Sequence, residues 1–218
     1  MFIHVNGIDL YYEKTGAGRP LIMTHCNSMD HRIFNKAVKL LKDRFTVYCP
    51  DTRDHGKSSK VKTLHYQDMA EDVYRFITAL EIEKPVFYGF SDGGIVGLLL
   101  AWEHPELLSE MVISGASLNP DSTKALPMKF FKFWSHVDRS DKMQIMMREP
   151  DITDEILRGI SVPVYVTAGS RDVIKEAHTR HIAETIPHAE LKIFEGEGHG
   201  SYIMRSNKIA KYIMEVIR

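Results

Sequence analysis

Short apolar segments alternate with segments of helical periodicity along most of this chain, and no other feature constrains its fold as strongly. The predicted strands are 2–5, 8–13, 20–24, 45–49, 85–88, 107–114, 163–168 and 190–194. The predicted helices are 31–42, 69–80, 93–103, 174–185 and about 202–217. Strands that alternate with helices of this length form βαβ units, in which helices cover both faces of a parallel sheet. The sequence therefore predicts an α/β fold with a mostly parallel, eight-stranded sheet.

One long segment interrupts this alternation. Residues 117–159 show no strand pattern but are rich in methionine and aromatic residues. We expect them to form a short helical lid on a core made of residues 1–116 and 160–218, because ligands of parallel sheets bind beyond the carboxyl ends of the strands. An ordinary packed helical pair is the alternative. Four aromatic residues of the segment are predicted to form an apolar wall for a substrate: Phe130, Phe131, Phe133 and Trp134.

Composition and charge exclude several classes of protein. The 218 residues are 44% apolar, and 28 basic residues nearly balance 29 acidic ones, so no overall positive field favours nucleic acid. Cys26 and Cys49 cannot form a disulfide framework and fit no zinc spacing. The N-terminus lacks signal-peptide character, and the longest apolar stretch, 95–102, is too short to span a membrane. We expect a cytoplasmic protein without a metal or organic cofactor, of unknown oligomeric state.

The segment Tyr88–Gly94 contains a G-x-S-x-G pattern between a predicted strand and a predicted helix. In this setting the pattern is typical of a nucleophile elbow, a tight turn that raises the serine hydroxyl above the sheet edge. Gly89 and Gly93 are expected because side chains there collide across such a turn, and Ser91 is expected to have a strained backbone. The alternative is a glycine-rich turn with an incidental serine.

A serine nucleophile needs a histidine base and an acid that orients it. In folds with this elbow the chain order is serine, acid, histidine. Asp172 follows the predicted strand 163–168, and His199 follows the strand 190–194, so both are expected at the same sheet edge as Ser91. Glu195 and Glu197 remain alternatives to Asp172, although they lie in the same loop as His199.

The turn after strand 20–24 is predicted to complete the site. Acyl transfer requires donors for a developing oxyanion. We expect these to be the backbone N–H groups of Asp92 and Asn27, with Cys26 as the alternative to Asn27. His25 is expected to be structural and to bond neighbouring loops. His136, in the insertion, is a less favoured candidate for lining the pocket.

Taken together, the elbow and the order of the triad make the chain resemble the α/β-hydrolase fold family over essentially its full length. The segment Asp51–Ser58 resembles the family's D-x-R-G-x-G-x-S loop, and His25–Asn27 resembles its oxyanion loop. The segment Ile160–Asp172 resembles the strand that carries the family's acid. Within the family, G-x-S-D-G-G is similar to the valacyclovir-hydrolase (biphenyl hydrolase-like) group of serine esterases.

This resemblance implies a serine hydrolase that cleaves a small-molecule ester or related acyl compound. It also implies that Asp92 attracts a substrate cation, for which the alternative is an ordinary acid in the first turn of a helix. The sequence departs from the family at Cys26 and Asp54, where glycine is usual; aspartate tolerates a left-handed backbone better than most residues. C–C bond hydrolysis, lactone opening, perhydrolysis, lyase chemistry and a non-catalytic binding protein remain alternatives.

Overall fold

A single eight-stranded sheet forms the centre of the protein in a computed structural model that describes residues 1–217. Its strands are β1 (Phe2–Val5), β2 (Ile8–Thr15), β3 (Arg19–Thr24), β4 (Phe45–Pro50), β5 (Val86–Phe90), β6 (Glu110–Ser114), β7 (Val164–Gly169) and β8 (Ala189–Phe194). They lie in the order β1-β2-β4-β3-β5-β6-β7-β8. Strands β3 to β8 pair in parallel, whereas the hairpin β1–β2 is antiparallel and pairs antiparallel with β4. The predicted, mostly parallel sheet of eight strands is confirmed.

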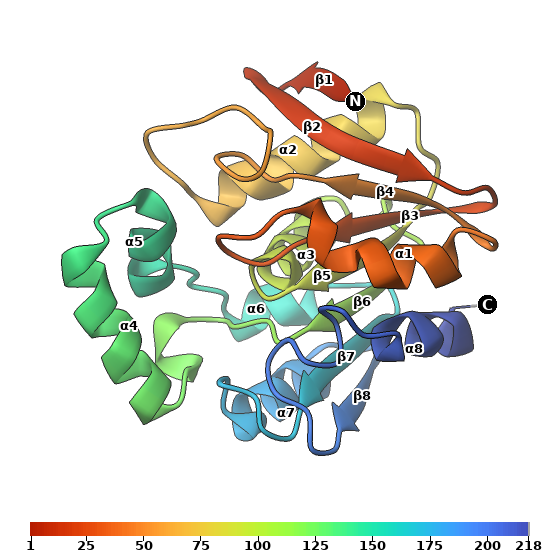
Figure 1. Ribbon diagram of the computed structural model, residues 1–218. Coiled ribbons are helices and arrows are strands. Elements are labelled where there is room, and N and C mark those ends of the chain that lie inside the picture. Colours follow the sequence, from red (N-terminus) through yellow and green to blue (C-terminus); the bar gives the residue numbers. More distant parts are fainter. Residues whose placement is uncertain (218) are drawn as a thin grey trace.

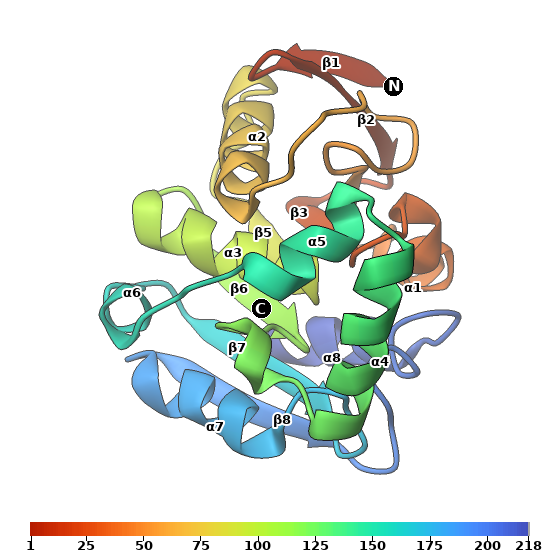
Figure 2. The same ribbon diagram turned by 90° about the vertical axis from the view of Figure 1, so that its left-hand side faces the viewer.

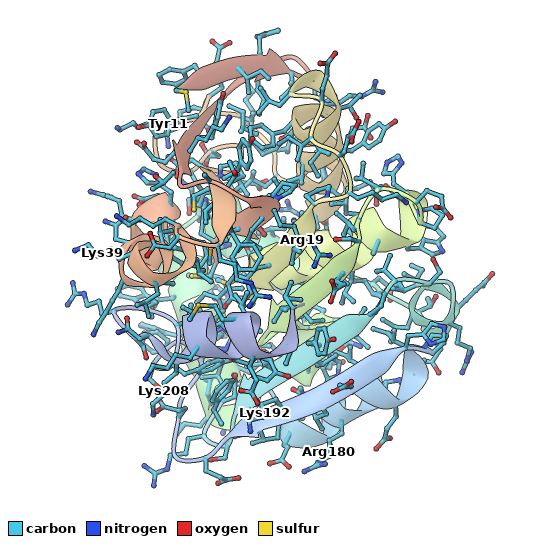
Figure 3. All side chains as sticks on the ribbon, turned by 90° about the vertical axis from the view of Figure 1, so that its right-hand side faces the viewer. Tyr11, Arg19, Lys39, Arg180, Lys192 and Lys208 are labelled. Atoms are coloured by element: carbon cyan, nitrogen blue, oxygen red, sulfur yellow. The ribbon has the colours of Figure 1, made fainter. Side chains whose placement is uncertain are left out.

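Helices cover both faces of this sheet. These helices include α1 (Asn35–Leu41), α2 (Tyr66–Ala79), α3 (Asp92–Glu103), α7 (Glu176–Thr185) and α8 (Lys208–Val216). Apolar residues of α2, α3 and α7 form one core cluster with the sheet, and those of α1 and α8 form a second cluster on its other face. Figure 3 shows this three-layer arrangement from the side, with α1 and α8 on one side of the strands and α2 and α3 on the other.

The connection between β6 and β7 contains the segment that interrupts the alternation. It holds η2 (Pro120–Ser122), α4 (Ala125–Val137), α5 (Asp141–Arg148) and α6 (Asp154–Arg158). Helix α6 packs on α3 and α7, whereas α4 and α5 contact each other. Figure 1 shows that the arrowheads of β3 and β4 point toward the side where α4 and α5 lie, and Figure 2 views these two helices from the front. The pair α4–α5, residues 125–148, therefore stands beyond the carboxyl ends of the strands.

Several boundaries differ from those expected, and two of these differences lie in β6 and in the last helix. Strand β6 begins at Glu110 rather than at residue 107, because 104–109 form a turn. The last helix begins at Lys208 rather than near 202: Tyr202 and Ile203 are fully buried, but from a turn that follows the loop of His199. Within residues 1–217, no helix is both long and apolar enough to cross a membrane.

Candidate active site

Ser91 lies in the sharp turn between β5 and α3, with φ 54° and ψ −111°. This positive φ is unusual for a residue with a side chain and marks local backbone strain. Close backbone contacts require glycine on both sides of the serine. A Cβ atom on Gly89 would lie 2.2 Å from the carbonyl oxygen of Gly93, and one on Gly93 would lie 2.3 Å from that of Thr24. The turn has the geometry of a nucleophile elbow.

The structure brings together three side chains that are far apart in the sequence. Nε2 of His199 lies 3.1 Å from Oγ of Ser91, and Nδ1 of His199 lies 2.7 Å from Oδ1 of Asp172. Each residue follows the carboxyl end of a parallel strand: Ser91 follows β5, Asp172 follows β7 and His199 follows β8. Both distances are hydrogen-bond distances, so one imidazole links the hydroxyl to the carboxylate.

Asp172 is held in place by its own loop. Its side chain is 3% exposed, and its Oδ1 also accepts a hydrogen bond of 2.9 Å from the backbone N–H of Ile174. The alternative acids lie elsewhere: Glu195 is exposed, and the Glu197 carboxylate pairs with Ser201 and Lys208. Among the three carboxylates considered, the structure therefore gives the contact with His199 to Asp172.

Gly115, at the end of β6, is a site residue that the sequence analysis missed. Its φ is +58°, and a Cβ atom there would lie 2.7 Å from Cε1 of His199 and 3.4 Å from Oδ2 of Asp172. Glycine at this position therefore leaves room for the imidazole and the carboxylate. A glycine directly after a predicted strand was the available signal, but it does not by itself indicate which side chain needs the space.

A cavity of about 290 Å³ opens over Ser91 and His199. Its apolar lining comes mainly from the segment before β7 and from the loop of Asp172, and includes Pro120, Met128, Phe131, Met146, Met147, Val173 and Ile174. Of the four aromatic residues predicted for this wall, Phe131 lines the cavity. The prediction is wrong for Phe130, Phe133 and Trp134, which lie on the outer side of α4 and are exposed.

The predicted oxyanion loop borders the same cavity. Cys26, Asn27 and Asp92 all line it beside Ser91. The Asn27 side chain donates hydrogen bonds of 2.9 Å to the Asp92 carboxylate and 3.0 Å to the carbonyl oxygen of Lys142 in α5. Burial raises the pKa of the Cys26 thiol to about 12, so this cysteine is a neutral wall residue at physiological pH.

The predicted structural role of His25 is confirmed. His25 is buried; its Nε2 accepts a hydrogen bond of 3.0 Å from the backbone N–H of Thr52, and its Nδ1 lies 2.8 Å from the carbonyl oxygen of Cys26. It thus connects two loops, as expected of a structural histidine. Asp54, where glycine is usual in the family, has φ 63°, in the left-handed region that aspartate tolerates better than most residues.

Tyr66, Asp92 and Glu149 form a connected polar group in the cavity. Asp92 is buried, and burial raises its pKa to about 6, although hydrogen bonds from Asn27 and Tyr66 favour the charged form. Glu149 accepts a hydrogen bond of 3.1 Å from the backbone N–H of Tyr66. Tyr66 and Glu149 were missed in the sequence analysis, since they come from the start of α2 and the end of α5, where no motif marks them.

The segment that carries α4 is attached directly to the loop of Asp172. Thr123 forms an isolated antiparallel bridge with Ile174, and the backbone N–H of Lys124 donates to the carbonyl oxygen of Val173 at 2.8 Å. The Lys124 ammonium also donates to the carbonyl oxygen of Asp172. His136, at the other end of α4, is exposed and does not line the cavity.

Within residues 1–217, one cluster of three potential metal ligands occurs, formed by Asp30, His31 and Asp51. Its groups already have partners. Asp51 accepts hydrogen bonds from the backbone N–H of His31 at 2.8 Å and of Lys57 at 2.9 Å, and Asp30 pairs with Arg32. We therefore interpret this cluster as a set of hydrogen-bonded side chains that holds the loops of His31 and Asp51 together, rather than as a metal centre.

Comparison with known proteins identifies the family. Residues 19–142, more than half of the chain, match the family described as "alpha/beta hydrolase fold". The chain belongs to the α/β-hydrolase fold family. The resemblance inferred from the elbow and the triad order is thus confirmed at the level of family and fold.

The chain is similar in sequence or in structure to several hydrolases. It is 33% identical to the human serine hydrolase BPHL over 122 residues, which span 53% of this chain and 42% of that protein. It is 35% identical to 3-oxoadipate enol-lactonase 1 of Acinetobacter baylyi over 102 residues, 46% of this chain and 38% of that protein. These matches thus span about two fifths of the curated relatives. A solved structure titled as Est816, an N-acyl homoserine lactone degrading enzyme, superposes with a TM-score of 0.84 at 21% identity and full coverage of both chains.

Proposed function

We propose that this protein is a serine hydrolase that cleaves a carboxylic ester or a related acyl compound through an acyl-enzyme on Ser91. The observation that carries this proposal is the pair of contacts made by His199, 3.1 Å to Ser91 and 2.7 Å to Asp172. A hydroxyl next to a neutral imidazole can lose its proton as it attacks a carbonyl carbon, and a buried carboxylate stabilises the imidazolium that forms.

In the first step, Ser91 Oγ bonds to the substrate's carbonyl carbon while His199 Nε2 accepts the hydroxyl proton. The tetrahedral intermediate collapses, the bond to the leaving oxygen breaks, and His199 returns the proton to that oxygen. In the second step, His199 takes a proton from water as the water attacks the acyl-enzyme, and gives it to Ser91 as the acid leaves. Asp172 holds the imidazole in orientation throughout. The reaction consumes one water and needs no cofactor.

The backbone N–H groups of Asn27 and Asp92 are our proposed donors to the oxyanion. Both residues border the cavity next to Ser91, and Asp92 begins α3, whose N-terminal dipole favours negative charge. The side chain of Asn27 is engaged with Asp92 and Lys142, which fixes the loop that carries the backbone donor. Loss of one such donor costs about 3 kcal/mol in the activation barrier.

Residues 117–159 are proposed to act as the lid. Helices α4 and α5 of this segment contribute Met128, Phe131, Met146 and Met147 to the cavity wall. This apolar wall fits an acyl group of small to medium size with apolar character. We propose that lactones are the second substrate class, because one similar protein is named an enol-lactonase. A lactone is a cyclic ester and needs no other catalytic group.

Asp92 is further proposed to attract a cationic group of the substrate, such as an amine. Glu149 borders the same cavity and is connected to Asp92 through Tyr66. Two carboxyl groups therefore lie in one polar region of the cavity. Asp92→Ala is expected to lower kcat/KM more for an aminoacyl ester than for the matching neutral ester. Equal losses on both esters would contradict this role. Location in the cytoplasm remains a prediction from the sequence.

The decisive experiment combines labelling with an activity screen. A fluorophosphonate probe is expected to label the wild-type protein at Ser91 and to leave Ser91→Ala unlabelled. The wild type is expected to hydrolyse p-nitrophenyl esters of graded chain length, with lactones and diketones assayed beside them to separate ester hydrolysis from lactone opening and C–C cleavage. Folded protein that reacts with neither probe nor ester would overturn the proposal in favour of a binding protein on this fold.

A further inference from the structure

The outer face of α4 exposes an unusual number of large apolar side chains. Leu126 is 79% exposed and Phe133 is 67% exposed, and three more residues of the helix belong to the same face: Phe130, Trp134 and Val137. They recur at spacings of three and four residues, so they lie side by side along one surface of the helix. We call this surface the outer apolar face. Solvated helices rarely present so continuous an apolar strip without a partner.

The charges of this helix are as distinctive as its apolar face. Between Lys124 and Val137 the sequence contains Lys129, Lys132 and His136 but no acidic residue. These three basic side chains also recur at spacings of three and four, which places them together on the flank beside the outer apolar face. The opposite, inner side of the helix carries Met128 and Phe131, which line the cavity. Helix α4 therefore has three distinct sides.

We propose that the outer apolar face of α4 inserts into the surface of an anionic lipid bilayer. A helix with one apolar side and a lysine-rich flank is suited to lie in the plane of such an interface, with its apolar side chains among the acyl chains. Lysine side chains reach from that depth to the lipid phosphates. Trp134 lies among these residues, and tryptophan is the residue type that favours the boundary between lipid and water.

A second copy of the chain fits this face less well. A helix of 13 residues is about 20 Å long and about 10 Å wide, so its single face buries far less than the roughly 1,200 Å² of a stable interface. Twofold pairing through α4 would also bring the lysines of both copies together, with no acidic residue on the helix to neutralise them. A negatively charged lipid surface meets both the apolar side and the positive flank.

The two tryptophans of the chain provide a built-in test. Trp134 lies in the outer apolar face, whereas Trp102 lies near the end of α3, and each is 41% exposed. Trp102→Phe leaves Trp134 as the reporter, and Trp134→Phe leaves Trp102. With vesicles of phosphatidylcholine and phosphatidylserine, emission of Trp102→Phe is expected to shift to shorter wavelength, and that of Trp134→Phe is expected to stay unchanged. Vesicles of phosphatidylcholine alone are expected to give a much smaller shift.

Vesicle flotation then tests charge and apolar contact separately. Lys129→Glu/Lys132→Glu is expected to weaken binding at least about 30-fold, since each lysine near an anionic surface contributes roughly fivefold. The matched control Lys36→Glu/Lys39→Glu makes the same charge change at the same spacing on α1, which lies away from α4 (Figure 1). This control is expected to change binding less than about threefold. Leu126→Ser/Phe133→Ser is expected to weaken binding at least about tenfold.

These variants alter exposed side chains, so the unfolding temperature is expected to change little. Binding involves no catalytic step and is measured on Ser91→Ala as well, so failure of the proposed hydrolase activity does not affect the result. The proposal is overturned if wild-type protein does not float with anionic vesicles, or if the α1 control weakens binding as much as the α4 variant. It is also overturned if Leu126→Ser/Phe133→Ser abolishes a dimer seen by analytical ultracentrifugation while vesicle binding is absent.

Discussion

Helices α3 and α4 are nearly equal in length and both rich in apolar residues, yet their surroundings are opposite. In α3, the ten consecutive residues from Asp92 to Ala101 are buried. In α4, none of the 13 residues is buried. Helix α3 packs against the sheet and α2, whereas α4 contacts α5 and contributes Met128 and Phe131 to the wall of the cavity over Ser91. Apolar content alone therefore does not determine the role of a helix in this protein.

Because α3 is buried and α4 is not, we expect α3 to contribute mainly to stability and α4 mainly to recognition. The residues of α3 hold the elbow against the core, so the position of Ser91 depends on tight packing on every side. None of the residues of α4 is buried, so we expect its inner side to contact substrate and its outer apolar face to contact lipid. We expect substitutions in α3 to change the free energy of unfolding and substitutions in α4 to change binding.

The largest expected effect concerns leucine, which occurs in both helices. Leu100 in α3 is fully buried, and Leu126 in α4 is 79% exposed. Leu100→Ala is expected to lower the free energy of unfolding by about 2–5 kcal/mol, because it leaves a cavity in the core. Leu126→Ala is expected to change it by less than about 0.5 kcal/mol. Urea unfolding followed by circular dichroism measures both, and similar losses would show that the outer face of α4 is covered in solution.

The second prediction concerns the first residue of α3. Burial raises the pKa of Asp92 from 3.8 to about 6, so between these pH values the folded protein keeps a proton that the unfolded chain has released. The contribution of Asp92 to stability therefore falls as pH rises through this range and stays low above about pH 6. Relative to Asp92→Asn, the wild type is expected to lose up to about 3 kcal/mol of its free energy of unfolding as the pH rises through this range. A stability difference that does not vary with pH would contradict the prediction.

A third prediction tests the space that Gly115 leaves for the imidazole of His199. Gly115→Ala places a methyl group against the ring of His199 and is expected to lower kcat/KM for an ester about 100-fold, because the base is displaced. Gly7→Ala is the matched control: Gly7 also has a positive φ, but a Cβ atom added there would meet nothing within 4 Å. If both variants retain full activity, Gly115 does not position His199.

The smallest expected effect lies at the base of α4. Lys124→Met removes the hydrogen bond to the carbonyl oxygen of Asp172 but keeps the apolar stem of the side chain. We expect kcat/KM to fall about fivefold, corresponding to about 1 kcal/mol for one hydrogen bond. Lys129→Met, on the flank of the same helix, is expected to leave hydrolysis of a soluble ester unchanged. Equal effects of the two substitutions would indicate that only the charge matters.

The sequence was sufficient to predict the sheet and the convergence of Ser91, Asp172 and His199. Each of these residues directly follows an apolar strand, and the carboxyl ends of parallel strands meet at one edge of the sheet, so a local pattern was enough to bring distant residues together. The same reasoning located the loop of Asn27. These predictions depended on which residues directly follow a strand and on turn chemistry, and both can be recognised within short segments.

The wall of the cavity was less predictable, because α4 is apolar on two sides. Phe130 and Phe131 are neighbours in sequence but lie about 100° apart around a helix, and here Phe131 lines the cavity whereas Phe130 is exposed. Nothing in the local pattern indicates which side faces inward; that depends on where α4 packs. Tyr66 and Glu149 were missed for a similar reason, since their connection with Asp92 exists only once α2 and α5 are brought together.

The attachment of α4 has a mechanical consequence. The bridge of Thr123 to Ile174 and the bond from Lys124 to Asp172 join the base of this helix to the loop of the triad's own acid. An outward movement of α4 would pull on that loop, because these contacts join the two segments. We therefore expect substitutions that move α4 to affect both access to Ser91 and the orientation of His199 by Asp172.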